Sequence, residues 1–156
     1  MPMHRPSRSP YAAFSFVEVL VVTVILTFFF ALAVNQLRRA RIARNEELAL
    51  NSIRVIGKAC HFYYVVNGRY PADLVTLGPS VSNPPYIDSM LTENPMSQQG
   101  YALTYRVVGG GAGFTLLGNP LTHKITGRRH FYTDQEFTVH ETSQNRNATS
   151  ADPSMS

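Results

Sequence analysis

The strongest pattern in the chain is an unbroken apolar run near its amino end. Residues 14–34 read FSFVEVLVVTVILTFFFALAV, which is 21 residues with a single charged side chain, Glu18. A bilayer core needs roughly 20 apolar helical residues, so this run is long enough to span a membrane. A lone spanning segment must be helical, because only a helix satisfies its own backbone hydrogen bonds. We therefore expect residues 14–34 to form a transmembrane helix.

The helix is expected to continue beyond the apolar run with a different pattern. No proline interrupts residues 14–70, and residues 35–65 carry one stripe of apolar or small side chains spaced by three or four positions. Charged residues between positions 38 and 47 are expected to pair along the helix. Gly68 and Pro71 are typical signals for its end. The stripe consists of Ala49, Ile53, Ile56, Cys60 and Tyr63.

After the helix, the spacing of apolar side chains changes to the alternation typical of strands. Residues 71–99 are rich in Pro, Ser and Asn, so we expect an irregular loop there. Residues 101–107 alternate large apolar with polar or small side chains, and a glycine-rich turn leads to a second strand at residues 114–118. Two short strands are expected at residues 129–133 and 137–141.

Together these elements predict an α+β fold, in which a long N-terminal helix packs on a small antiparallel sheet of about four strands. The loop and the sheet would form one small domain over residues 66–141. From residue 142 onward the chain is rich in Ser, Thr, Asn and Asp, and its only large apolar residue is Met155. Because this composition is typical of disorder, residues 142–156 are expected to be a disordered tail.

The short segment before the apolar run is basic. Residues 1–13 contain Arg5, Arg8 and no acidic residue, as N-terminal targeting segments do. The chain has a formal net charge of +4, and this leader contributes about half of it. The rest is too weakly basic to indicate nucleic-acid binding, which usually shows as Lys and Arg clustered on one face.

Glu18 is the residue that a plain membrane span does not explain. A carboxylate at membrane depth costs roughly 3 kcal/mol on insertion scales, and such a group usually has a partner or a function. One reading is a side chain that reaches the interface and has no further role. The other reading needs a cation at the same depth. Cleavage after Ala13 would create one, the α-amino group of Phe14, on a neighbouring subunit.

The sequence AFSFVEVLVVTVIL resembles the N-terminal signature of type IV prepilins and type II secretion pseudopilins. In that signature a small residue, usually Gly, is followed by Phe, three residues rich in Thr, Leu and Ile, Glu, and a long apolar helix. Ala13 stands here where the family usually has Gly. The resemblance implies that a prepilin peptidase cuts between Ala13 and Phe14 and methylates the Phe14 amine. It also implies that Glu18 pairs with this amine of a neighbour during assembly.

Two later stretches also resemble this family. GKACHFYYVVNGRYPADLVTLG is similar to the family's helix end, which has Gly-x-Tyr-Pro and then a pair of Leu. TGRRHFYTDQEFTVHE is similar to its C-terminal sheet, with Phe137 near the position where Gly is usual. In the first stretch the matching residues are Gly68, Tyr70, Pro71, Leu74 and Leu77.

The resemblance implies a structural subunit of a type IV pilus or a type II secretion pseudopilus, assembled with itself or related pilins into a helical filament. It implies a prepilin peptidase, an inner-membrane assembly platform and membrane lipid as partners. It places the chain as a single-pass protein of the bacterial inner membrane with a periplasmic C-terminal domain, and then in the filament. Major pilins, minor pilins and pseudopilins share this plan, so the machine stays open.

Two alternatives remain open from the sequence. Ala31-Leu32-Ala33 is an A-x-A sequence that general signal peptidase could cut, which would release a secreted globular binding protein beginning near Val34. A membrane-anchored binding module that never assembles would keep the span and need no cleavage at Ala13.

Enzyme chemistry is not expected. Cys60 is the only cysteine, and no set of catalytic partners for it is visible in the sequence. The histidines lack the spacing of a metal site, and no cofactor is expected. Asp134 and Glu136 leave calcium open, although a calcium ion needs six to eight oxygen ligands and only these two carboxylates cluster there.

Overall fold

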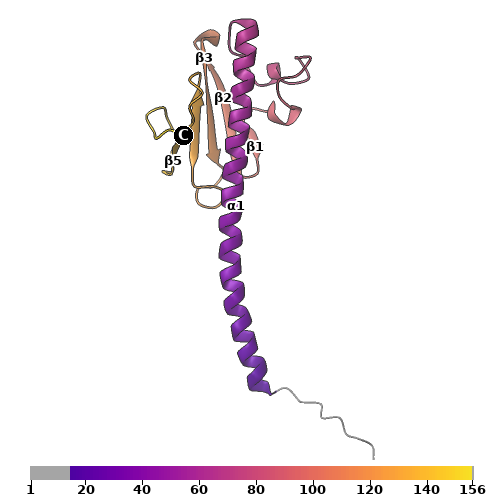
Figure 1. Ribbon diagram of the computed structural model, residues 1–156, viewed down its shortest axis with the longest axis vertical. Coiled ribbons are helices and arrows are strands. Elements are labelled where there is room, and N and C mark those ends of the chain that lie inside the picture. Colours follow the sequence, from indigo (N-terminus) through magenta and orange to yellow (C-terminus); the bar gives the residue numbers. More distant parts are fainter. Residues whose placement is uncertain (1–14, 156) are drawn as a thin grey trace, which may run out of the picture. The chain divides into compact units, whose positions relative to one another are not determined.

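The computed structural model describes residues 15–155. The expected leader at residues 1–13 and the expected cleavage site at Ala13 and Phe14 lie outside the described residues. The chain divides into two compact units, Met1–Arg38 and Arg39–Ser156. The first contains the N-terminal part of one helix, and the second contains the rest of that helix and a sheet (Figure 1).

The helix α1 spans Phe16–Asn67 and has 52 residues, as the uninterrupted sequence pattern predicts. It begins after Ser15, whose carbonyl oxygen accepts a hydrogen bond from the Glu18 N–H at 3.0 Å. Its end is set by Gly68, which has a φ of 70° and donates its N–H to the Tyr64 carbonyl at 2.8 Å. Glycine adopts this left-handed conformation without a Cβ clash, so the predicted stop signal is confirmed.

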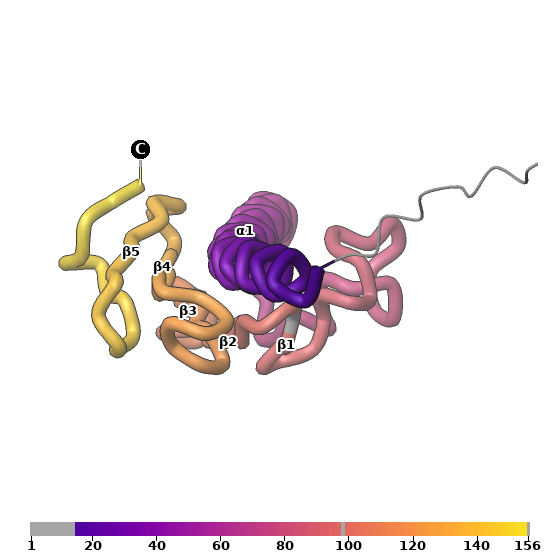
Figure 2. Tube along the Cα trace, turned by 90° about the horizontal axis from the view of Figure 1, so that it is seen from below, coloured from indigo at the N-terminus to yellow at the C-terminus, as the bar shows by residue number. Residues whose placement is uncertain are grey.

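Five strands form one antiparallel sheet in the order β1-β2-β3-β4-β5, so each strand pairs with its neighbour in sequence (Figure 2). The α+β layout is as predicted, with one strand more than the expected four. The extra strand is β1, which is three residues long and pairs with β2. The strands are β1 Met96–Gln98, β2 Tyr101–Val108, β3 Gly113–Pro120, β4 His130–Asp134 and β5 His140–Thr142.

The core of the second unit lies between α1 and one face of the sheet. The predicted helical stripe supplies Ile53, Ile56 and Cys60, which are all fully buried. Alternate residues of β2 face them, and Tyr101 and Leu103 have no exposed surface. Burying a large apolar side chain stabilises the fold by about 1.5–3 kcal/mol, so this layer accounts for the attachment of α1 to the sheet.

The loop between α1 and β1 is irregular, as predicted, but it is tied to the core. Leu74 and Leu77 are fully buried, and the second of them lies in a short 3₁₀ turn, Val75–Leu77. The Tyr105 hydroxyl donates a hydrogen bond to the Pro71 carbonyl at 2.7 Å. These anchors fix the start of the loop against the sheet.

The C-terminal segment differs from the sequence prediction, because residues 142–155 are ordered along β5 and not a disordered tail. The Met155 N–H donates to the Val139 carbonyl at 2.8 Å, and Met155 packs against the core. Ala148 is only 2% exposed. Composition alone missed these contacts, because it does not show specific pairings such as that of the Glu141 N–H with the Pro153 carbonyl at 2.9 Å.

Candidate functional site

The first part of α1 is apolar and entirely uncovered. Every residue from Ser15 to Arg41 is exposed, and Phe28, Phe29 and Phe30 keep 62–69% of their surface. By length and composition this part is one candidate membrane-spanning helix. Exposed apolar surface is unfavourable in water by roughly 25 cal/mol per Å², so this segment requires lipid or protein around it. The chain is thus consistent with a single-pass membrane protein.

The two threonines of this segment form side-chain hydrogen bonds within the helix. The Thr23 hydroxyl donates to the Val19 carbonyl at 2.7 Å, and the Thr27 hydroxyl donates to the Val24 carbonyl at 2.8 Å. Such local bonds allow a polar side chain to sit at membrane depth without an external partner. These threonines therefore need no functional explanation.

The Glu18 side chain forms no such hydrogen bond within the described residues. It is exposed in the first turn of α1, and within residues 15–155 its carboxylate makes no hydrogen bond or ion pair. The partial positive charge at a helix N-terminus favours an anion there, by about 0.3–1 kcal/mol at an exposed site. The carboxylate remains available to a cation from another chain. The pairing expected with a Phe14 amine lies outside the described residues.

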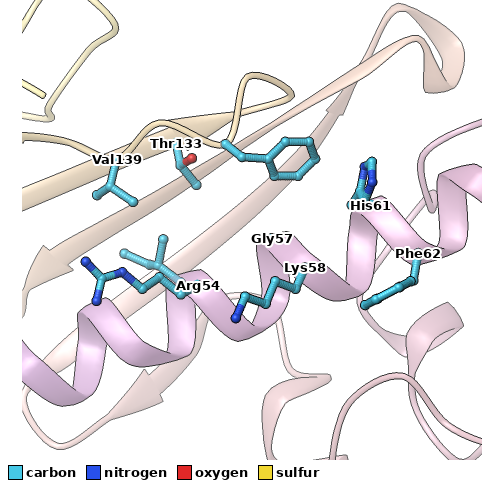
Figure 3. A pocket seen from close by; sticks show the side chains of 9 residues that line it. Arg54, Gly57, Lys58, His61, Phe62, Thr133 and Val139 are labelled. Carbon is cyan, nitrogen blue, oxygen red and sulfur yellow. The ribbon is translucent and has the colours of Figure 1, made fainter. Parts of the chain in front are cut away.

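A second surface feature lies in the Arg39–Ser156 unit, where α1 meets the end of the sheet. It is a mainly apolar groove of about 510 Å³. Figure 3 shows Gly57 and His61 on the helix side, with Thr133 and Val139 on the opposite wall. This α1–β4 groove joins residues that are about 80 positions apart in sequence. Its main lining residues are Ile53, Gly57, His61, Thr133, Phe137 and Val139.

Phe137 forms one wall of the α1–β4 groove in an unusual conformation. Its φ is 59°, in the left-handed region that favours glycine, and 39% of its surface is exposed. The centroid of its ring lies 5.1 Å from the centroid of the His61 ring, in an edge-on contact. In the resemblance, Phe137 lies near the position where Gly is usual, and glycine adopts this conformation without a Cβ clash.

Asp134 and Glu136, the residues considered for calcium, lie at the turn after β4. Asp134 accepts hydrogen bonds from the Tyr132 hydroxyl at 3.0 Å and from the Glu136 N–H at 2.9 Å. Both bonds close the turn after β4. Within residues 15–155 no group of three or more His, Cys, Asp or Glu side chains is placed to hold a metal ion.

Cys60 is placed for packing. It is fully buried, and burial raises the pKa of its thiol to about 12, against a smaller opposing effect of a hydrogen bond with Tyr105. Since the thiolate is the reactive form, Cys60 is inert at neutral pH.

The structure reveals one polar cluster that sequence analysis missed. Glu46 was expected on the charged side of α1, with neighbours along the helix, but it is only 7% exposed and faces the sheet. Its carboxylate accepts hydrogen bonds from the Arg128 N–H at 2.8 Å and from Arg129 Nε, also at 2.8 Å. Arg129 also pairs with Glu141 at 2.9 Å. The spacing of Glu46 from Ala49 and Ile53 could have signalled a buried face.

Comparisons with known proteins identify no family. No protein-family model matches the chain. A search of curated proteins gives no match either.

Proposed function

We propose that this chain is the precursor of a structural subunit of a type IV pilus or a type II secretion pseudopilus. A prepilin peptidase removes the leader, and the subunit assembles through α1 into a helical filament. Before assembly the apolar part of α1 lies in the bacterial inner membrane. The C-terminal domain lies in the periplasm.

One observation carries the proposal: α1 performs two different tasks along its length. From Ser15 to Arg41 it buries nothing within the chain, whereas from Ile42 onward it supplies a face of the core. A plain anchor would need the first property only and would have no use for Glu18. Packing against the same helix of other subunits would cover the apolar surface and place a neighbour's amine near that carboxylate.

The helix also argues against release by general signal peptidase. Ala31, Leu32 and Ala33 lie inside α1, which continues without a break to Asn67. Cleavage there would cut a helix whose later residues hold the core together, and it would leave Glu18 in the discarded part.

The test is the mature N-terminus of the protein purified from its native host, read by mass spectrometry. The proposal predicts an N-terminal peptide that begins at Phe14 and carries one extra methyl group. A peptide that begins near Val34 would replace the proposal by a secreted protein. An uncleaved Met1 would favour a membrane-anchored binding module.

A further inference from the structure

One of the residues that line the α1–β4 groove is a glycine inside a helix. Gly57 lies in the middle of α1, where glycine costs about 1 kcal/mol relative to alanine. A Cβ at this position would meet its nearest non-local atom, Phe137 Cδ1, at an ordinary 3.7 Å. Close packing inside the chain therefore does not require the glycine. Its effect is a groove floor without a side chain, and this floor is buried beneath the Phe137 ring.

The opposite wall of the groove contains a residue in an unfavourable backbone conformation. A left-handed backbone costs a non-glycine residue roughly 1–2 kcal/mol, and Phe137 adopts it at a φ of 59°. The result is a large aromatic ring set over the helix and left 39% exposed. Strain of this kind persists where the surroundings enforce it and is frequent at binding sites.

The rim of the groove is positively charged. Arg54 and Lys58 line it one helical turn apart, as Figure 3 shows, and both are exposed. Within residues 15–155 neither side chain makes an ion pair or a hydrogen bond. Like charges four residues apart on a helix repel by a few tenths of a kcal/mol. An acidic group at the rim would relieve this repulsion.

A matching surface lies in the loop between α1 and β1. Met90, in the 3₁₀ turn Ser89–Leu91, is 78% exposed, more than any other large apolar side chain in residues 39–155. Asp88 and Glu93 flank it, are exposed and have no side-chain partner in the described chain. The segment Asp88–Glu93, the Met90 loop, thus presents a flexible apolar side chain between two carboxylates.

From this complementarity we propose that the α1–β4 groove of one copy receives the Met90 loop of a second copy. Methionine adapts to irregular apolar grooves and is frequent at interfaces. The carboxylates of Asp88 and Glu93 would meet Arg54 and Lys58, and such rim charges fix orientation and reject wrong partners. The inference rests on the proposed function, because it names the contact between the domains of neighbouring subunits.

The positions of the two surfaces give this contact a direction. Figures 1 and 2 both show the loop before β1 on one side of α1 and β4 and β5 on the other. A contact between two different surfaces leaves one of each free on every pair, so it propagates into a chain or ring. A symmetric dimer, in contrast, would bring the same patch of both copies together.

Cysteine cross-linking of the full-length chain in its native host tests this arrangement. With the double variant Lys58→Cys and Glu93→Cys, oxidation is expected to give a ladder of dimers, trimers and larger species. Each single variant gives monomers, and co-expression of the two single variants gives dimers that extend no further. The buried Cys60, with its pKa raised to about 12, stays unreactive. The matched control pairs Glu93→Cys with Arg106→Cys, an exposed position on β2.

Charge exchange provides the second arm of the test. Lys58→Glu is expected to lower multimer formation about tenfold, and Glu93→Lys in the same chain is expected to restore it. Recovery in the double variant rules out simple misfolding.

Each contrary result has a distinct meaning. Dimers from Lys58→Cys alone would replace the inference by a symmetric groove-to-groove contact. Filaments that form but give no ladder would overturn this contact and leave the proposed function standing. Monomers with an N-terminus near Val34 would overturn both.

Discussion

Among single residues, Glu46 carries the clearest structural role. Its carboxylate is buried at 7% exposure and accepts hydrogen bonds from the backbone and side chain of the segment before β4. Arg129 also forms an ion pair with Glu141, and its Cζ lies 5.4 Å from the centroid of the Phe131 ring. Because one carboxylate serves several donors, its removal leaves more than one of them without an acceptor.

We predict that Glu46→Ala lowers the free energy of unfolding by about 2 kcal/mol, since unsatisfied buried donors cost about 1–3 kcal/mol. The measurement is urea unfolding of the full-length chain in detergent micelles. The matched control is Glu47→Ala, an exposed neighbour on α1, for which a change within about 0.5 kcal/mol is expected. Equal effects of the two variants would contradict the role given to Glu46.

His130 is a second residue with a defined environment. Its Nδ1 lies 2.8 Å from Asn119 Oδ1 and its Nε2 lies 3.3 Å from His123 Nδ1. Burial lowers the pKa of His130, and the nearby charges of His123 and Arg146 lower it further. The folded chain therefore resists a proton that the unfolded chain accepts below a pKa of about 6.5.

Because the pKa of His130 is lower in the folded chain, its contribution to stability is complete above about pH 6.5 and declines as the pH falls below that value. We predict that the free energy of unfolding decreases between pH 7 and pH 5, and that His130→Gln decreases less over the same range. Unfolding midpoints of both proteins at pH 5, 6, 7 and 8 give the two slopes. Parallel slopes would show that another group causes the decline.

At the scale of elements, a glycine inside α1 and the glycine directly after it have opposite requirements. Gly68 ends the helix with a φ of 70°, and apart from its own residue and its two chain neighbours no heavy atom lies within 4 Å of the place its Cβ would occupy. Gly57 lies inside the helix and tolerates a Cβ at 3.7 Å from Phe137. The first glycine is needed for its backbone conformation, whereas the second is not.

We expect Gly68→Ala to destabilise the domain by about 1 kcal/mol, because alanine resists the left-handed conformation. Gly57→Ala should stabilise it by about 0.5–1 kcal/mol through helix propensity. Thermal unfolding of both variants beside the wild type measures the two signs. A loss of stability with Gly57→Ala would mean that the groove floor is packed more tightly than its geometry indicates.

The sequence predicted those elements whose signal is local. The helix, its end at Gly68 and the strand from Tyr101 follow from spacing and from glycine chemistry, and Glu18 is visible as the one charge in an apolar run. Strand β1 was missed because three residues carry little periodicity and depend on pairing with β2. The α1–β4 groove was missed because its walls come from helix and sheet residues about 80 positions apart.

At the scale of the whole molecule, the two units differ in how their apolar side chains are covered. The Arg39–Ser156 unit covers its own core, whereas the described residues of the first unit leave every apolar side chain exposed. Lipid and copies of the same helix are both suitable covers, and under the proposed function only the second uses the Glu18 carboxylate. Membrane insertion and assembly should therefore respond differently to changes at Glu18.

We predict that Glu18→Ala inserts into the membrane as well as the wild type but yields no filaments. Removing a charge makes the span more apolar, so insertion is favoured, while the pairing with a neighbour's amine that we propose is lost. Membrane fractionation and the amount of sheared filament protein measure the two steps separately. Thr23→Ala is the matched control, because the Thr23 hydroxyl is already bonded to Val19 at 2.7 Å within α1 and its loss should leave both steps intact. A normal filament yield with Glu18→Ala would remove the role assigned to this carboxylate and leave α1 as a membrane anchor.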